Sequence, residues 1–131
     1  MKQYYDKKYL SWQKTVGAFG GQANLIKFSE HIRQNDKVID FGCGGGYLLN
    51  SINCREKIGI EVNSSARKLA ESNGIKAAAS YKAIPNNWAD VIISNHVLEH
   101  TENPLQEIKQ LLPKLKRGGK IIFVVPCGTL S

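Results

Sequence analysis

The chain has 131 residues and a mass of 14.5 kDa, which is the size of one domain. A hydrophobic share of 42% and a charged share of 22% are ordinary for a globular chain and exclude a disordered one. Eighteen Lys and Arg against eleven Asp and Glu leave a net charge of +7, but the positive residues are spread along the chain. We interpret them as solvated surface, so we expect no nucleic-acid partner.

The sequence shows no membrane or export signal. No apolar run approaches the roughly 20 residues that a membrane helix needs, and the N-terminus lacks the apolar stretch of a secretory signal. The three cysteines are Cys43, Cys54 and Cys127, and none belongs to a CxxC pair, so neither a disulfide scaffold nor a cysteine zinc site is supported. We therefore expect a cytoplasmic protein that does not bind a membrane.

Apolar periodicity along the chain alternates between helical and strand patterns, which is typical of repeated βα units. A first helix is expected over residues 22–33, where the apolar side chains share one face. Continuous apolar runs predict buried parallel strands at 38–41, 58–62, 75–79, 91–93 and 120–125.

Cap and breaker residues predict where the other helices begin and end. Asn63 or Ser64 is expected to cap a helix that ends at residues 73–74, an Asn-Gly pair. Residues 103–104, an Asn-Pro pair, predict the start of a further helix that Pro113 interrupts. Residues 118–119, two glycines, are expected to form the turn into the last strand.

This order of elements predicts an α/β fold, a three-layer sandwich with a mainly parallel sheet. Residues 1–36 are expected to form an N-terminal helical segment whose aromatic residues either cover the sheet edge as a lid or only pack there. Residues 37–131 are expected to form the core of a single domain. Ligands of such sheets bind beyond the carboxyl ends of the strands.

A glycine-rich turn, residues 40–46 with the sequence DFGCGGG, follows the first strand. Its glycines permit positive φ and close approach of a ligand, and Asp40 could also cap the turn through its amides. The strict dinucleotide pattern GxGxxG fails, because Tyr47 takes the sixth position counted from Gly42. Glu61 ends the second strand, where its carboxylate, expected to be solvated without ligand, can accept both hydroxyls of a ribose.

On these residues the chain resembles the class I S-adenosylmethionine-dependent methyltransferases, in particular their small-molecule group, over residues 37–126. Residues 84–95 are similar to the family's run into the fourth strand, and residues 111–119 to its stretch before the fifth. The resemblance implies a Rossmann-like sheet, S-adenosylmethionine as cofactor, and methyl transfer to a small or medium-sized acceptor. It places Asp40, Gly42, Cys43 and Gly44 at the methionine end, Glu61 at the ribose, Val62 at the adenine, and Asn95 and His96 facing the cofactor.

Two departures from the family pattern affect these assignments. Many relatives carry an aspartate for the adenine amine after the third strand, where this chain has Ser80. Either Ser80 with Tyr81 supplies that contact, or backbone and packing hold the adenine. Relatives also have further strands after the fifth, so we expect a sheet cut short there and leave open whether the chain is part of a longer protein.

Several alternatives stay open at this stage. The run from His96 to His100 matches the HxxEH zinc pattern, but it follows a strand directly and lacks a third ligand, so we expect no metal. His96 is a candidate general base, with a structural histidine as the alternative, and no catalytic residue is assigned. Three competing functions stay open: a non-catalytic S-adenosylmethionine-binding module, an NAD-binding oxidoreductase and, because of the net charge of +7, nucleic-acid modification. The acceptor atom and the oligomeric state are left open.

Overall fold

The computed structural model describes residues 25, 27–95 and 97–124. The aromatic residues of the expected lid, His96 and the last residue of the predicted fifth strand lie outside this part. Of the N-terminal segment, residues 25 and 27–29 are helical, and Phe28 is fully buried in the core.

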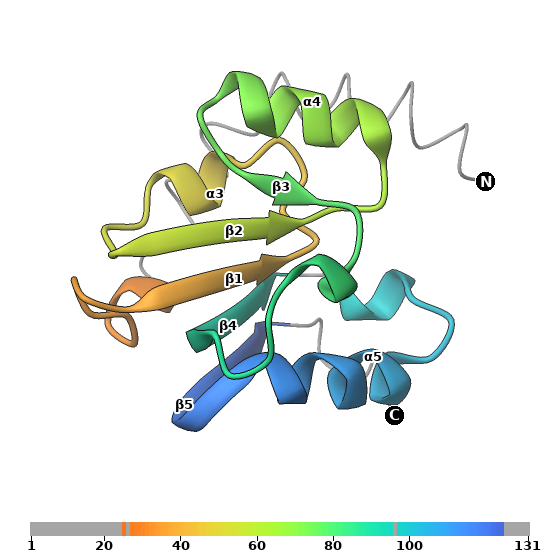
Figure 1. Cartoon of the computed structure of the whole chain (residues 1–131). Coiled ribbons are helices and arrows are strands. Elements are labelled where there is room, and N and C mark those ends of the chain that lie inside the picture. Colours follow the sequence, from red (N-terminus) through yellow and green to blue (C-terminus); the bar gives the residue numbers. More distant parts are fainter. Residues whose placement is uncertain (1–24, 26, 96, 125–131) are drawn as a thin grey trace.

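Five parallel strands form one sheet in the order β3-β2-β1-β4-β5 (Figure 1). Their bounds are β1 Lys37–Phe41, β2 Glu56–Ile60, β3 Ala77–Ala78, β4 Ala89–Asn95 and β5 Leu115–Val124. The chain runs outward from β1 to β3 and then returns to the other side of β1 for β4. The strand order therefore reverses between β1 and β4, and the predicted α/β fold with a parallel sheet is confirmed.

Helices cover both faces of this sheet, which gives the predicted three layers (Figure 1). One face carries α3 (Tyr47–Asn50) and α4 (Ser64–Ser72), and the other carries α5 (Pro104–Leu111). Neighbouring side chains of β1 pack on opposite faces of the sheet. Val38 belongs to the hydrophobic cluster that contains Phe28, whereas Ile39 belongs to the cluster that contains Leu111. Three short 3-10 helices join these elements, namely η2 (Tyr81–Ala83), η3 (Leu98–His100) and η4 (Leu112–Lys114).

The predicted helix caps are confirmed. Asn63 Oδ1 accepts the amide of Ala66 at 2.8 Å, which begins α4, and Asn103 Oδ1 accepts the amide of Gln106 at 3.1 Å, which begins α5. The last α4 residue is Ser72, followed by the predicted Asn-Gly pair. The regular α5 helix stops two residues before Pro113, as expected for a residue that cannot donate an amide hydrogen bond.

Three strand predictions differ from the structure. The predicted second strand includes Glu61 and Val62, but β2 ends at Ile60, so both residues follow the strand. The third strand is only Ala77–Ala78, because Ile75 before it is buried against the helical layer instead of pairing. The fifth strand begins at Leu115, so the turn predicted at residues 118–119 is wrong. Leu115 pairs with Ala89 and Lys120 with Val91, so residues 116–119, which include both glycines, form an irregular, bulged part of the strand opposite Asp90.

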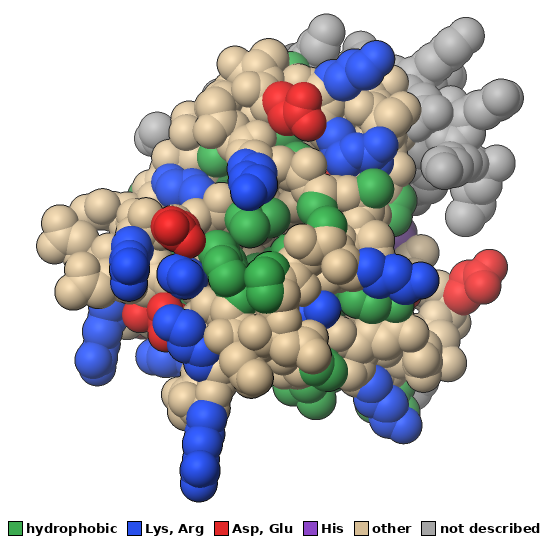
Figure 2. All heavy atoms as spheres, viewed as in Figure 1, with side chains coloured by type: hydrophobic (Ala, Val, Ile, Leu, Met, Phe, Trp, Pro, Cys, Tyr) green, Lys and Arg blue, Asp and Glu red, His purple; other side chains and the backbone are tan. Residues whose placement is uncertain are grey.

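The described surface carries charge of both signs. Figure 2 shows Lys and Arg side chains distributed over the visible face, with Asp and Glu between them. Within the described part of the chain, no helix has the length and apolar character needed to cross a membrane.

Candidate functional site

The glycine-rich turn leaves β1 and folds back over the end of β2. The amides of Gly42 and Cys43 both donate to the carbonyl of Ile60, at 2.7 and 3.1 Å. Gly42 has a φ of +79°, and a Cβ added to it would lie 2.5 Å from Val97 Cγ2. Both the backbone conformation and the lack of space therefore require glycine at this position.

Glu61, directly after β2, links this turn to α4. Its Oε1 accepts the amide of Gly44 at 3.0 Å, and its Oε2 accepts the amide of Asn63 at 3.0 Å. We expected the Glu61 carboxylate to be solvated in the absence of a ligand. This expectation is wrong, because the carboxylate accepts hydrogen bonds from two main-chain amides. A carboxylate offers about four acceptor positions, so two remain for a ligand.

Asp40 lies beneath the turn, in the middle of the sheet, with 3% of its surface exposed. Burial, with a smaller contribution from the negative charge of Glu61, raises the pKa of Asp40 to about 8. The amides of Gly42, Cys43 and Gly44 donate to Ile60 and Glu61, so the capping role considered for Asp40 is taken by other groups. At neutral pH the Asp40 carboxyl is mostly protonated.

Cys43 serves packing. Its side chain is buried, and its Sγ lies where any side chain on Gly59 of β2 would have to be. Burial raises the pKa of the Cys43 thiol far above its usual value, with further contributions from the nearby carboxyl groups. A thiol in this state is a poor nucleophile.

The ends of β3 and β4 bring further predicted residues to the same edge of the sheet. Ser80 Oγ accepts the amide of Lys82 at 3.2 Å and so caps η2, and Tyr81 packs against the hydrophobic cluster on the α5 face. Asn95, the last residue of β4, has a buried Oδ1 with no hydrogen-bond partner among the described residues. An acceptor in this position is available to a ligand.

The segment after β4 does not form the helix that the zinc pattern requires. Leu98–His100 is a 3-10 turn, and the side chain of His100 is 61% exposed. No group of three or more His, Cys, Asp or Glu side chains suited to a metal occurs within the described residues, and His96 lies outside them.

Sequence reasoning missed Arg67. Its guanidinium Nη1 donates to the carbonyls of Glu61 and Val62, at 2.8 and 3.0 Å. The one available signal was its position four residues after the cap Asn63, from which a helical side chain reaches back toward the start of the helix.

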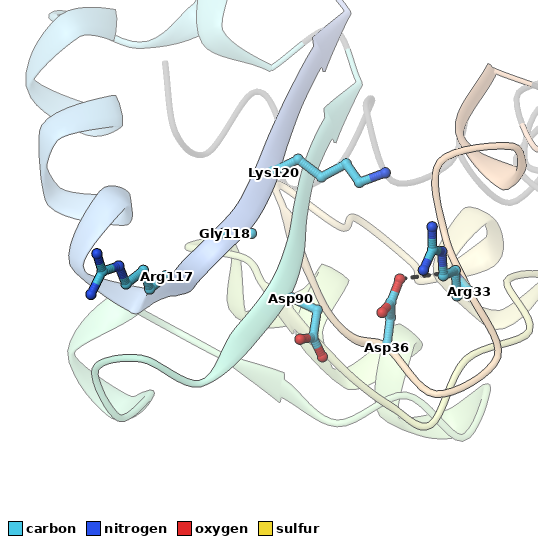
Figure 3. Close-up of a pocket in the computed structure, with 7 residues that line it drawn as sticks. Arg33, Asp36, Asp90, Arg117, Gly118 and Lys120 are labelled. Carbon is cyan, nitrogen blue, oxygen red and sulfur yellow. Dashed lines mark hydrogen bonds between the residues drawn. The ribbon is translucent and has the colours of Figure 1, made fainter.

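A pocket of about 240 Å³ lies at the opposite, amino end of the strands (Figure 3). Its carboxylates are engaged, since Asp36 accepts the amide of Arg33 at 2.8 Å and Asp90 accepts that of Lys37 at 2.8 Å. Figure 3 shows Lys120 pointing toward Arg33 across the pocket. None of the predicted site residues lines it, so the carboxyl edge of the sheet is the candidate site.

A parallel sheet with a glycine-rich turn after β1 and an acid after β2 defines the Rossmann-like class of nucleotide-cofactor domains. A family model described as a methyltransferase domain matches residues 18–131. The chain belongs to this methyltransferase family.

The chain is also similar to individual proteins. An uncharacterized protein of Methanocaldococcus jannaschii is 37% identical over 105 residues, which cover 78% of this chain and 50% of that protein. A ubiquinone biosynthesis O-methyltransferase of Bordetella pertussis is 26% identical, covering 87% of this chain and 47% of the enzyme. A crystal structure of a SAM-dependent methyltransferase from Archaeoglobus fulgidus shares the fold with a TM-score of 0.70, at 21% identity, over 84% of this chain and 54% of that one. The chain spans about half the length of the curated relatives it matches.

Proposed function

We propose that this domain binds S-adenosylmethionine at the carboxyl edge of the sheet and transfers its methyl group to a small or medium-sized acceptor. The observation that carries the proposal is the hydrogen bond between the Gly44 amide and the Glu61 carboxylate. This bond unites the glycine-rich turn and the acid after β2 in one site. Membership of the methyltransferase family supports the reaction type.

The residues at this edge fit such a cofactor. Glu61 retains two acceptor positions for the ribose hydroxyls, and the side chain of Val62, 68% exposed, offers an apolar surface to the adenine. Asn95 offers its buried amide oxygen. The methionine end would lie on the turn, against Asp40, Gly42, Cys43 and Gly44, with Ser80 and Tyr81 beside the adenine.

When bound, S-adenosylmethionine supplies a methyl group on a positively charged sulfur, which becomes a neutral thioether when an acceptor lone pair takes the methyl carbon. The task of the protein is then to hold the acceptor in line, and such orientation can contribute about 7–11 kcal/mol in favourable cases. A general base is needed only where the acceptor atom arrives protonated. His96 stays the candidate for that role.

The competing functions have less support. A dinucleotide site needs a third glycine where this chain has Tyr47, the first residue of α3. The matched relatives include ubiquinone biosynthesis O-methyltransferases, which favours a small-molecule acceptor over nucleic acid. We extend the proposal to a cytoplasmic location, supported by the free Cys43 and Cys54.

Calorimetric titration with S-adenosylhomocysteine and with NADH tests the proposal. We expect binding of the former only. Glu61→Ala should weaken it about tenfold or more, and Glu61→Gln should fall between parent and alanine variant because the amide keeps one acceptor oxygen and loses the charge. Glu56→Gln, which neutralises an exposed acid at the other end of β2, is the matched control. Absence of heat and of thermal stabilisation at millimolar S-adenosylhomocysteine would refute the cofactor. Binding without turnover on a panel of acceptors would favour the non-catalytic module.

A further inference from the structure

Arg67 holds two successive peptide groups of the loop between β2 and α4. It is the fourth residue of α4, and its own amide bonds to the carbonyl of Asn63 at 3.0 Å. Helical side chains lean toward the N-terminus of their helix, which brings the guanidinium to the residues just before the cap. One nitrogen, Nη1, carries two N–H groups and donates to the carbonyls of Glu61 and Val62.

With these two bonds, the main-chain amide, the carbonyl and the carboxylate of Glu61 all have hydrogen-bond partners. Its amide donates to the carbonyl of Ala78 at 2.8 Å, and its carboxylate accepts the amides of Gly44 and Asn63. Its carbonyl is the remaining main-chain group, and Arg67 binds it with a charged donor, which makes a stronger bond than a neutral one. Without the guanidinium, the carbonyls of Glu61 and Val62 lose these bonds, and the hydrogen bond from the Asn63 amide to the Glu61 carboxylate remains to hold the peptides on either side of Val62.

We propose that Arg67 is a positioning residue for the nucleoside half of the ligand: it fixes the Glu61–Val62 loop so that the carboxylate meets the ribose hydroxyls. The inference rests on the proposed function of this edge of the sheet. Both bonds of Arg67 go to main-chain carbonyls, so its influence on a ligand passes through Glu61 and Val62.

A double-mutant cycle on the full chain, read by calorimetry with S-adenosylhomocysteine, tests this role. Arg67→Ala should raise the dissociation constant roughly five- to thirtyfold, which corresponds to about one or two kcal/mol of binding free energy. In a Glu61→Ala background the same change should have little further effect, because residues that act as a unit are not additive. Lys68→Ala removes the same charge from the next, exposed residue of α4 and should leave affinity unchanged.

A comparison of two nucleosides, one with and one without the ribose hydroxyls, distinguishes a positioning role of Arg67 from a purely structural one. The parent should bind adenosine more tightly than 2′,3′-dideoxyadenosine, and Arg67→Ala should reduce this preference. Arg67→Lys keeps a charged donor and should lie between parent and alanine variant, which also keeps the test available if Arg67→Ala does not fold. Urea unfolding of each protein without ligand establishes that folded chains are compared.

Three results would overturn the inference. The first is parent-like affinity in Arg67→Ala and Arg67→Lys. The second is full additivity with Glu61→Ala, and the third is an unchanged preference for the ribose hydroxyls. Failure of the parent itself to bind S-adenosylhomocysteine would instead refute the proposed function, and the inference with it, before any variant is measured.

Discussion

The buried carboxyl of Asp40 makes the stability of the ligand-free protein depend on pH. Burial, followed by the charge of Glu61, raises its pKa from 3.8 to about 8. Between these two values the folded protein holds a proton that the unfolded chain has released. The free energy of unfolding therefore falls as pH rises, by roughly 1.4 kcal/mol per pH unit, and this loss ends above the folded pKa.

Asp40→Asn removes this dependence, because the amide has nearly the shape of the protonated carboxyl and does not titrate. Between about pH 5 and about pH 7 the parent should lose about 3 kcal/mol of stability that the variant keeps. The variant should thus be the more stable protein at neutral pH. It should also bind S-adenosylhomocysteine more weakly, as expected when a functional group is held in the core at the expense of stability.

Urea unfolding of parent and variant over this pH range measures the difference directly. The quantity to compare at each pH is the unfolding free energy of the parent minus that of the variant. All other groups titrate alike in both proteins, so their contributions cancel in this difference. Glu71→Gln, at an exposed position of α4, controls for the replacement of one carboxyl group by an amide. A difference that stays constant across the range would refute the reasoning, since it would mean that Asp40 titrates alike in the folded and unfolded states.

The remaining predictions concern single side chains at the same edge of the sheet. Gly42→Ala should destabilise the protein by about 2 kcal/mol or more in urea unfolding, because φ is +79° and the new Cβ meets Val97, and parent-like stability would contradict the geometry. Asn95→Ala should reduce affinity for S-adenosylhomocysteine at little cost in thermal stability, because its Oδ1 is unpartnered; equal losses in both would assign it a structural role. In the native protein Cys43 should react with thiol reagents more slowly than the half-buried Cys54, and mass spectrometry of the labelled chain showing the reverse order would contradict the burial argument.

Local signals were sufficient for much of the fold. The caps Asn63 and Asn103 are visible in sequence because each accepts an amide three residues further along the chain. The glycine-rich turn is visible because the positive φ of Gly42, Gly44 and Gly46 is a local property of the backbone. The continuous apolar runs likewise indicated a sheet buried on both faces, since Val38 and Ile39 are each fully buried.

The partners within the site depend on contacts between distant segments and could not be predicted. The bond from Gly44 to Glu61 exists because β1 and β2 pair with Phe41 opposite Ile60, which sets the turn beside the acid. The start of β5 depends on β4 in the same way, because pairing with Ala89 extends the strand across the bulged residues 116–119, whose glycines indicate a turn by local propensity.

Because β1 lies in the centre of the sheet, the two ends of the proposed site differ in rigidity. Asp40 sits on a strand that is paired on both sides, opposite Gly59 of β2 and Ile93 of β4. Groups mounted on doubly paired backbone lose little conformational entropy when a ligand arrives, whereas the side chain of Val62, 68% exposed, still has rotamer freedom to lose. Under the proposed binding mode, the methionine end would lie against preorganised backbone and the adenine against an adjustable side chain, so we expect changes in the ligand to be tolerated better at the adenine.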